Sequence, residues 1–181
     1  MVQMSPISRS GLRDLKIAPW TSENSYGTTL DIDAAQAFTV TLITQTAVLE
    51  GDDIEKDSFA KIKSVEATMR NGDVSLDVLD LLTGGTLYAG VGYDDVLISA
   101  DDNIGYFGVV GKVVGTQAGC TMIFIPKAKI FGNINYQAQG NSYLIPEVQI
   151  KGVNEGAING MVRIRHYDVD TAVTIPLPAA S

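Results

Sequence analysis

Histidine and cysteine are almost absent from this chain of 181 residues, which contains one of each. With Cys120 alone no disulfide can form within the chain, and with His166 alone a zinc site lacks its usual ligands. A Ser-His-Asp or Cys-His arrangement would have to be built around His166. Cys120 opens an apolar run and His166 lies in the alternating stretch 161–168, so we interpret both as structural residues. The sequence therefore predicts no enzyme activity and no metal or cofactor site.

Long apolar runs and clusters of basic residues are also missing. No run approaches the ~20 residues that a membrane helix needs, and the start of the chain lacks the features of a secretory signal. Lys and Arg number 13 against 21 Asp and Glu, which gives a net charge of −8. Because nucleic-acid binding needs clustered cations, this balance disfavours it. We expect a soluble protein, made in a reducing cytoplasm and not associated with a membrane.

What the chain does contain is a series of short segments rich in β-branched residues, separated by Asp, Asn and Gly. Hydrophobic residues make up 45% of the chain and charged residues 19%, which is typical of a globular protein. Strands are predicted at 12–17, 38–42, 64–70, 86–91, 96–100, 106–114, 121–125, 127–131, 143–151 and 161–167. The predicted fold class is mainly β, an antiparallel β-sandwich or partial barrel with one short α-helix.

Two prolines interrupt these segments. Because proline cannot donate to a strand ladder, we expect Pro126 and Pro146 at bulges or sheet edges. We divide the chain into an N-terminal arm (1–35), a β-sandwich domain (36–175) and a C-terminal extended tail (176–181).

An acidic loop lies between the strands that follow the N-terminal arm. The two strands are predicted to form a hairpin that projects beyond the domain, and the alternation slips at Leu42-Ile43, which predicts a bulge. The loop is no calcium loop, since Ser58 stands where the required glycine would be. It is either a solvated tip or a contact with a basic surface on another subunit. Its residues are Glu50, Gly51, Asp52, Asp53, Ile54, Glu55, Lys56 and Asp57.

A single helix is predicted at 74–83. Asp73 or Ser75 can cap its start, and Gly84 with Gly85 ends it. Leucines recur at helical spacing on one face, which predicts that this face packs against a sheet. The expected core anchors are Leu76, Leu79 and Leu82.

The order of these elements resembles the tail tube (major tail) proteins of long-tailed, non-contractile bacteriophages. The first block that carries the resemblance runs from Ala47 through the acidic loop and the second hairpin strand to the helix and its Gly84-Gly85 stop. The second block comprises 125–132 and 143–148, which are similar to the paired strands near the end of those proteins. Together the matching elements span residues 36–175.

The resemblance implies a structural virion protein that self-assembles into stacked hexameric rings, forming the tail tube. Inner sheets would join into a ring-shaped β-barrel with an acidic lumen, through which DNA passes during ejection without specific binding. The loop 50–57 would reach a neighbouring ring. Glu66 and the face with Thr39 and Thr41 are the candidates to line the channel. Tape measure and tail terminator proteins would be further partners, with assembly in the host cytoplasm.

Two other classes stay open. One is a capsid decoration protein or adhesin-type binding module built on a similar sandwich. The other is a ring protein of a secretion or injection apparatus. Self-assembly of the purified protein separates a tube from a decoration module, because the latter stays small until it meets a capsid.

Overall fold

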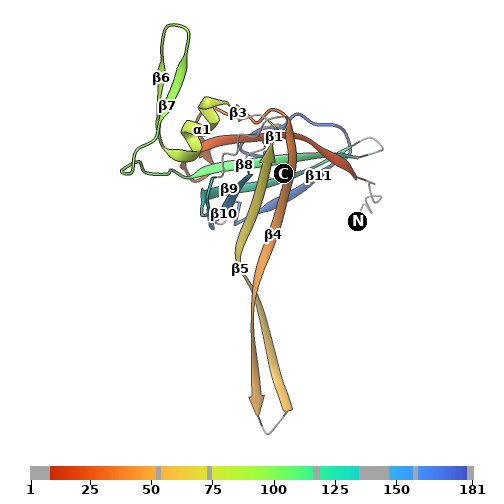
Figure 1. Cartoon of the computed structure of the whole chain (residues 1–181). Coiled ribbons are helices and arrows are strands. Elements are labelled where there is room, and N and C mark those ends of the chain that lie inside the picture. The colour runs from red at the N-terminus through yellow and green to blue at the C-terminus, as the bar shows by residue number, and fades with distance from the viewer. Residues whose placement is uncertain are drawn as a thin grey trace, which may run out of the picture.

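The computed structural model describes residues 9–51, 54–72, 75–115, 119–134, 147–156 and 159–178, and within these ranges all side chains except those of 9–10, 47–51 and 54–58. It is mainly β, with antiparallel strands and one short helix, which confirms the predicted fold class. Two hairpins extend from a curled central body (Figure 1). The elements are β1 (Arg9–Ser22), β2 (Ser25–Tyr26), β3 (Leu30–Asp31), β4 (Ala35–Gly51), β5 (Ile54–Asn71), α1 (Leu76–Thr83), β6 (Thr86–Ala89), β7 (Asp94–Leu97), β8 (Phe107–Gly115), β9 (Cys120–Ile130), β10 (Glu147–Gly152) and β11 (Arg163–Tyr167).

The main sheet runs in the order β2-β1-β8-β9-β10-β5-β4, with β3 beside β1 and β11 beside β9, while β6 and β7 form a separate pair. The sheet curls so that β4 comes back against β1 and β8. A Cβ atom on Gly111 of β8 would collide with the ring of Phe38 of β4, so a glycine is needed for this close approach. In the described strands β1 and β4 pack without pairing, and the curl is not a closed barrel.

The long strand β9 changes partners at Pro126. It pairs with β11 as far as Phe124 and with β10 from Ala128 onwards. The register with β8 also shifts opposite Pro126, which confirms the bulge predicted there. Proline has no backbone N–H to donate. At Pro126, β9 has left β11 and has not yet met β10, so no ladder bond to either strand is lost there. The predicted break between strands 121–125 and 127–131 is therefore wrong, and Pro146 lies outside the described residues.

The interior of the curl is filled from both ends of the sheet. Leu15 and Ile17 of β1 are fully buried in one cluster with Val65 and Met69 of β5. Within the predicted N-terminal arm 1–35, β1 belongs to the sheet, and the division of the chain into domains stays a prediction. Register shifts near the start of β1 interrupt its alternation, which is why the sequence pattern showed only part of this strand.

A second, smaller cluster covers the outer side of β8 and β9. Val110, Met122 and Phe124 pack there against Val173 and Leu177 from the segment after β11. Leu177 is only 1% exposed. The described part of the predicted tail, residues 176–178, therefore lies against the domain.

The helix α1 starts two residues later than predicted, at Leu76. Of the two predicted caps, Ser75 takes the role, since its hydroxyl oxygen accepts a hydrogen bond from the backbone N–H of Val78 at 3.4 Å. Gly84 ends the helix with a φ of +71°, a conformation that glycine adopts without strain. Both ends of the helix are therefore set by local sequence.

The buried face of α1 differs in detail from the leucine pattern. Leu82 is 1% exposed and joins the inner core, and Val78 is buried equally deeply beside it. Leu76 and Leu79 are half-buried. The helix is thus anchored by Val78 and Leu82, with Leu79 turned towards the edge of the contact.

Replacing Leu82 with alanine should lower the free energy of unfolding by about 2–5 kcal/mol, because the side chain leaves a cavity in a closed core. Leu79→Ala is the matched control, and it should cost less because Leu79 is only half-buried. Urea denaturation followed by circular dichroism measures both values. Equal losses for the two variants would contradict this assignment of the buried face.

Candidate assembly surfaces

The strands β4 and β5 continue beyond the body as a two-stranded arm (Figure 1). β5 pairs with β10 only from Val65 to Arg70, whereas its pairing with β4 runs from Asn71 back to Ile54. At a rise of ~3.3 Å per residue, the part of β5 between Ile54 and Val65 is about 35 Å long. We call the segment 43–64 the long hairpin. Its projection agrees with the prediction from the sequence.

The long hairpin begins at a bulge. The register shifts between Ile43 and Thr44, which confirms the predicted bulge to within a residue. Beyond it, large apolar side chains stand in solvent, with Phe59 61% and Ile62 46% exposed. The arm has backbone pairing, and the large apolar side chains described on it are not buried in a core.

The predicted acidic loop is shorter than expected, because strand pairing continues through most of it. Leu49 pairs with Asp57, Glu50 with Glu55, and Gly51 with Ile54. Pairing satisfies the backbone groups without any core, so an antiparallel ladder can extend far from the body. Of the predicted stacking residues, β4 holds Glu50 and Gly51, β5 holds Ile54, Glu55, Lys56 and Asp57, and Asp52 and Asp53 lie outside the described residues.

The outer edge of β4 is open. This strand is 17 residues long and stands at the end of the described sheet, with β5 on one side and no described strand on the other. Unpaired N–H and C=O groups along such an edge form a template for another strand. The edge of β4 is therefore a surface suited to pairing with a second chain.

The residues predicted to line a channel lie together on one face of the sheet. Thr41 of β4 pairs with Glu66 of β5, and two positions along, Thr39 pairs with Thr68. The intervening Val40 packs against the core, so its neighbours in the strand point outward. The structure thus brings all three candidates onto the outer face of β4 and β5.

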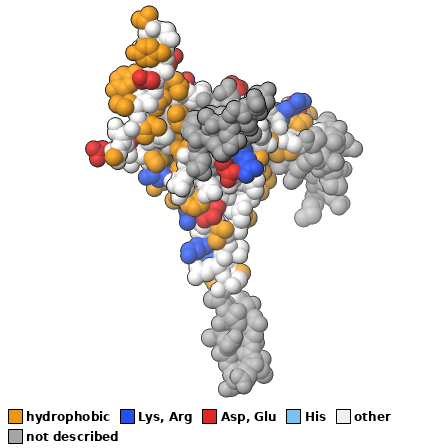
Figure 2. Space-filling model, in the orientation of Figure 1, with side chains coloured by type: hydrophobic (Ala, Val, Ile, Leu, Met, Phe, Trp, Pro, Cys, Tyr) orange, Lys and Arg blue, Asp and Glu red, His pale blue; other side chains and the backbone are white. Residues whose placement is uncertain are grey.

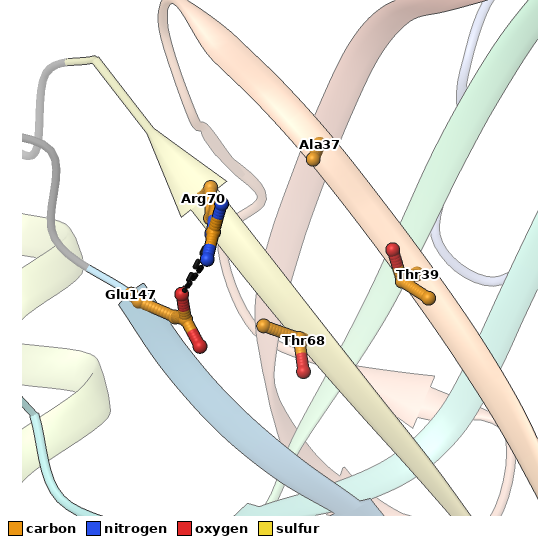
Figure 3. Close-up of a pocket in the computed structure, with 5 residues that line it drawn as sticks. All are labelled: Ala37, Thr39, Thr68, Arg70 and Glu147. Atoms are coloured by element: carbon orange, nitrogen blue, oxygen red, sulfur yellow. Dashed lines mark hydrogen bonds and ion pairs between the residues drawn. The ribbon is translucent and has the colours of Figure 1, made fainter.

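An ion pair and two threonines surround an open hollow of about 290 Å³ on this face. Arg70 on β5 and Glu147 on β10 point towards each other across neighbouring strands, with 2.6 Å between the guanidinium nitrogens and the carboxylate (Figure 3). Thr39, Thr68 and Ala37 complete the lining. The lining is polar, and Arg70 holds the carboxylate of Glu147 in an ion pair.

The described part of the same face carries basic as well as acidic side chains. Lys151 of β10 lies 3.8 Å from Glu66, and its neighbour in the register is Lys129 of β9. The ammonium of Lys127 stands 3.7 Å above the ring centre of Trp20, where the ring quadrupole attracts it. Cations therefore lie among the carboxylates on this face, and the acidic channel wall implied by the resemblance stays a prediction.

Glu155 joins the loop after β10 to the turn between β1 and β2. Its Oε1 accepts from the indole N–H of Trp20 at 2.8 Å and the backbone N–H of Asn24 at 2.9 Å, and lies 2.9 Å from the hydroxyl of Tyr26. Its Oε2 accepts from the amide of Asn159 at 2.6 Å. Partial burial alone would raise the pKa of Glu155, but these donors hold that pKa below its usual value. Burial, together with the bond to Glu155, raises the pKa of Tyr26.

The hairpin β6–β7 is the second arm, and hydrophobic side chains gather on it in Figure 2. The sequence pattern predicted both strands but not that their apolar residues stay in solvent. The sequence offered no signal for this exposure, because these strands carry apolar residues as the strands of the core do. The exposed apolar residues here are Leu87, Tyr88, Val91, Tyr93, Leu97 and Ile98.

The chain's single histidine and single cysteine both lie in strands of the main sheet. No three His, Cys, Asp or Glu side chains in the described part of the chain are grouped as metal ligands. His166 Nδ1 lies 3.0 Å from Thr121 Oγ1, and the buried Sγ of Cys120 lies 3.7 Å from the carbonyl of Val169. Within the described residues, no helix has the length and apolar character to cross a membrane.

Comparison with known proteins gives a distant likeness in structure and none in sequence. No protein-family model matches the chain, and neither does any curated protein. Among solved structures, the fold is similar to a chain in "Cryo-EM structure of the anti-feeding prophage (AFP) baseplate, 6-fold symmetrised". The identity is 13% and the TM-score 0.43, over 94% of this chain and 100% of that chain. A likeness at this level supports no functional argument, so the function has to be argued from the surfaces.

Replacing Glu155 with glutamine should lower the free energy of unfolding at pH 7 by roughly 1–3 kcal/mol, because one amide oxygen cannot accept all the bonds of a carboxylate. The pKa of Glu155 is lower in the folded state, so its contribution is full above the ordinary value of 4.5 and is lost as the pH falls through the folded value. The difference between the wild type and the variant should therefore shrink on acidification. Denaturation curves at several pH values measure it, and a difference independent of pH would show that the charge has no role.

Proposed function

We propose that this chain is a structural protein of a bacteriophage tail or a related injection particle, and that its copies assemble into stacked rings that form a tube. In this proposal the rings are hexameric and neighbouring inner sheets join into a ring-shaped β-barrel, as in the tail tube proteins that the sequence resembles. One observation carries the proposal. The open edge of β4 is 17 residues long, and its part from residue 43 onward belongs to the long hairpin.

An open edge and a projecting hairpin suit contacts in two directions. A strand of a neighbouring copy that pairs with β4 would continue the sheet, and closing the sheet around a ring removes the edge. The long hairpin reaches beyond the body, so it can contact a copy in the next ring. Repeated head-to-tail contacts of this kind produce a filament.

The outer face of β4, β5 and β10 would line the channel in such a ring. Glu66, Thr39 and Thr41 lie on it, as expected for channel-lining residues. Its paired charges, Arg70 with Glu147 and Lys151 with Glu66, leave little attraction for a polyanion. We propose that DNA passes along this face without specific binding, in a tube that also meets tape measure and terminator proteins in the virion.

In this proposal the chain acts through assembly and has no catalytic role. The support is the character of its described surfaces, which consist of strand edges, polar sheet faces and exposed apolar hairpins. These are contact surfaces, and the hollows beside them hold no paired nucleophile and base.

Shortening the long hairpin should abolish stacking and leave the body folded. Ala47 and Phe59 are directly opposed, so residues 48–58 can be replaced by Asn-Gly, which favours a two-residue hairpin turn. The body should keep its thermal midpoint, because the removed residues lie beyond the core. Electron microscopy should show no tubes for this variant at concentrations where the wild type forms them.

A full-length control separates length from charge. Changing Asp52 and Asp53 to Asn and Glu55 to Gln keeps the length of the hairpin and removes three carboxylates. If charge pairs between subunits contribute, assembly of this variant should be weaker at low salt and less sensitive to salt than that of the wild type. Normal tubes from the shortened variant would contradict the proposed stacking role. A wild type that stays monomeric and binds only capsids would indicate a decoration module instead.

Duplex DNA should not bind measurably to the assembled protein near physiological salt. On the proposed channel face, carboxylates accompany Arg70 and Lys151, and Lys127 is held over an aromatic ring. Tight binding by counterion release needs several free cations per site. Fluorescence anisotropy with a labelled duplex tests this expectation. Micromolar binding that weakens steeply with added salt would contradict a passive conduit.

A further inference from the structure

The hairpin β6–β7 lacks the support that a short hairpin normally needs. Its strands have four residues each and pair only with each other among the described strands. An isolated two-stranded hairpin is at best marginally stable in water, and this one also exposes large apolar side chains. Val91 at its tip is fully exposed, Tyr93 is 65% exposed and Tyr88 is 51% exposed. Such an arm gains stability when a partner covers it.

The tip is a tight turn that presents one apolar knob. The backbone N–H of Gly90 donates to the carbonyl of Tyr93 at 2.7 Å, and the ring of Tyr93 lies against Gly90. Gly92 has a φ of +85°, which suits glycine. Val91 is therefore held outward at the end of a defined turn.

A mostly apolar hollow lies at the foot of the same hairpin. It has a volume of about 250 Å³ and is lined by Leu79 and Thr83 of α1, Ile98 after β7, and Ile134. Four strand residues at ~3.3 Å each separate the tip from this foot, so a hairpin cannot place its own tip in its own hollow. The knob and the hollow can meet only between two molecules.

We propose that the tip of β6–β7, with Val91 at its centre, docks into the Leu79–Ile98–Ile134 hollow of a second copy of this chain. The occupant is a second copy because the chain carries both complementary parts. Asp94 and Asp95 follow the tip directly, which disfavours insertion into a lipid surface. The contact is heterologous, with different surfaces on the two sides, so it propagates from copy to copy. It rests on the proposed self-assembly and assigns a second arm to it.

Disulfide trapping tests the contact directly. A chain carrying Val91→Cys and Ile98→Cys should give a ladder of dimers, trimers and larger species on mild oxidation, because the two thiols approach only between neighbours. The native Cys120 is fully buried and does not compete. Chains with only one of the two changes should cross-link to each other when mixed. The control chain carries Val169→Cys together with Ile98→Cys. Val169 is 65% exposed and lies outside both surfaces, so this chain should give no ladder.

A second measurement uses the charge of aspartate. Val91→Asp should weaken self-association in sedimentation experiments roughly tenfold or more, since a buried interfacial carboxylate is unfavourable. Val169→Asp should have no such effect, and both variants should keep the unfolding midpoint because both sites are exposed.

The outcomes separate this inference from the proposed function. The wild type could form tubes while the double-cysteine chain gives no ladder and Val91→Asp associates normally. That result would contradict the docking contact and would still support the proposed tube. A ladder from a protein that never forms rings or tubes would support the docking contact and contradict the proposed function as a tube protein. A wild type that does not self-associate at any concentration would overturn both.

Discussion

Burial inside one curled sheet is the interaction on which the rest of this structure depends. Leu15 and Ile17 near the start of the chain share a core with Val65 and Met69, and α1 closes it with Val78 and Leu82. The curl requires a glycine at position 111, where Phe38 packs from the opposite end of the sheet. Most of these contacts join distant parts of the sequence, so the body forms through non-local pairing and not through local propensity.

The parts that this core does not reach are the parts that suggest a function. The long hairpin and the hairpin β6–β7 have internal backbone pairing, and most of their described side chains are exposed, while the edge of β4 has no described partner strand. A protein that functions as a monomer usually blunts such features with short edges, charges or prolines. Their retention here, on arms that extend from the body (Figure 1), fits a subunit whose neighbours supply the missing contacts.

Features with local causes were predictable from the sequence, and features that depend on distant partners were not. Alternation revealed the long hairpin and its bulge near Ile43, and capping chemistry located Ser75 and Gly84. The continuity of β9 through Pro126 depends on β10 and β11, which arrive from later in the chain. The basic residues of the outer face, Lys129 and Lys151 among them, could not be placed from the sequence either, because composition gives the net charge and not its distribution. The role of Glu155 also requires partners more than 100 residues away in sequence.

Negative-stain electron microscopy of the concentrated wild-type protein tests the central claim most directly. The account predicts rings of six copies, stacked with a regular repeat into tubes with an open channel. It also predicts that side views show the rings joined at their faces, where the long hairpins reach across. Single particles that remain monomers or small dimers at every concentration would contradict it.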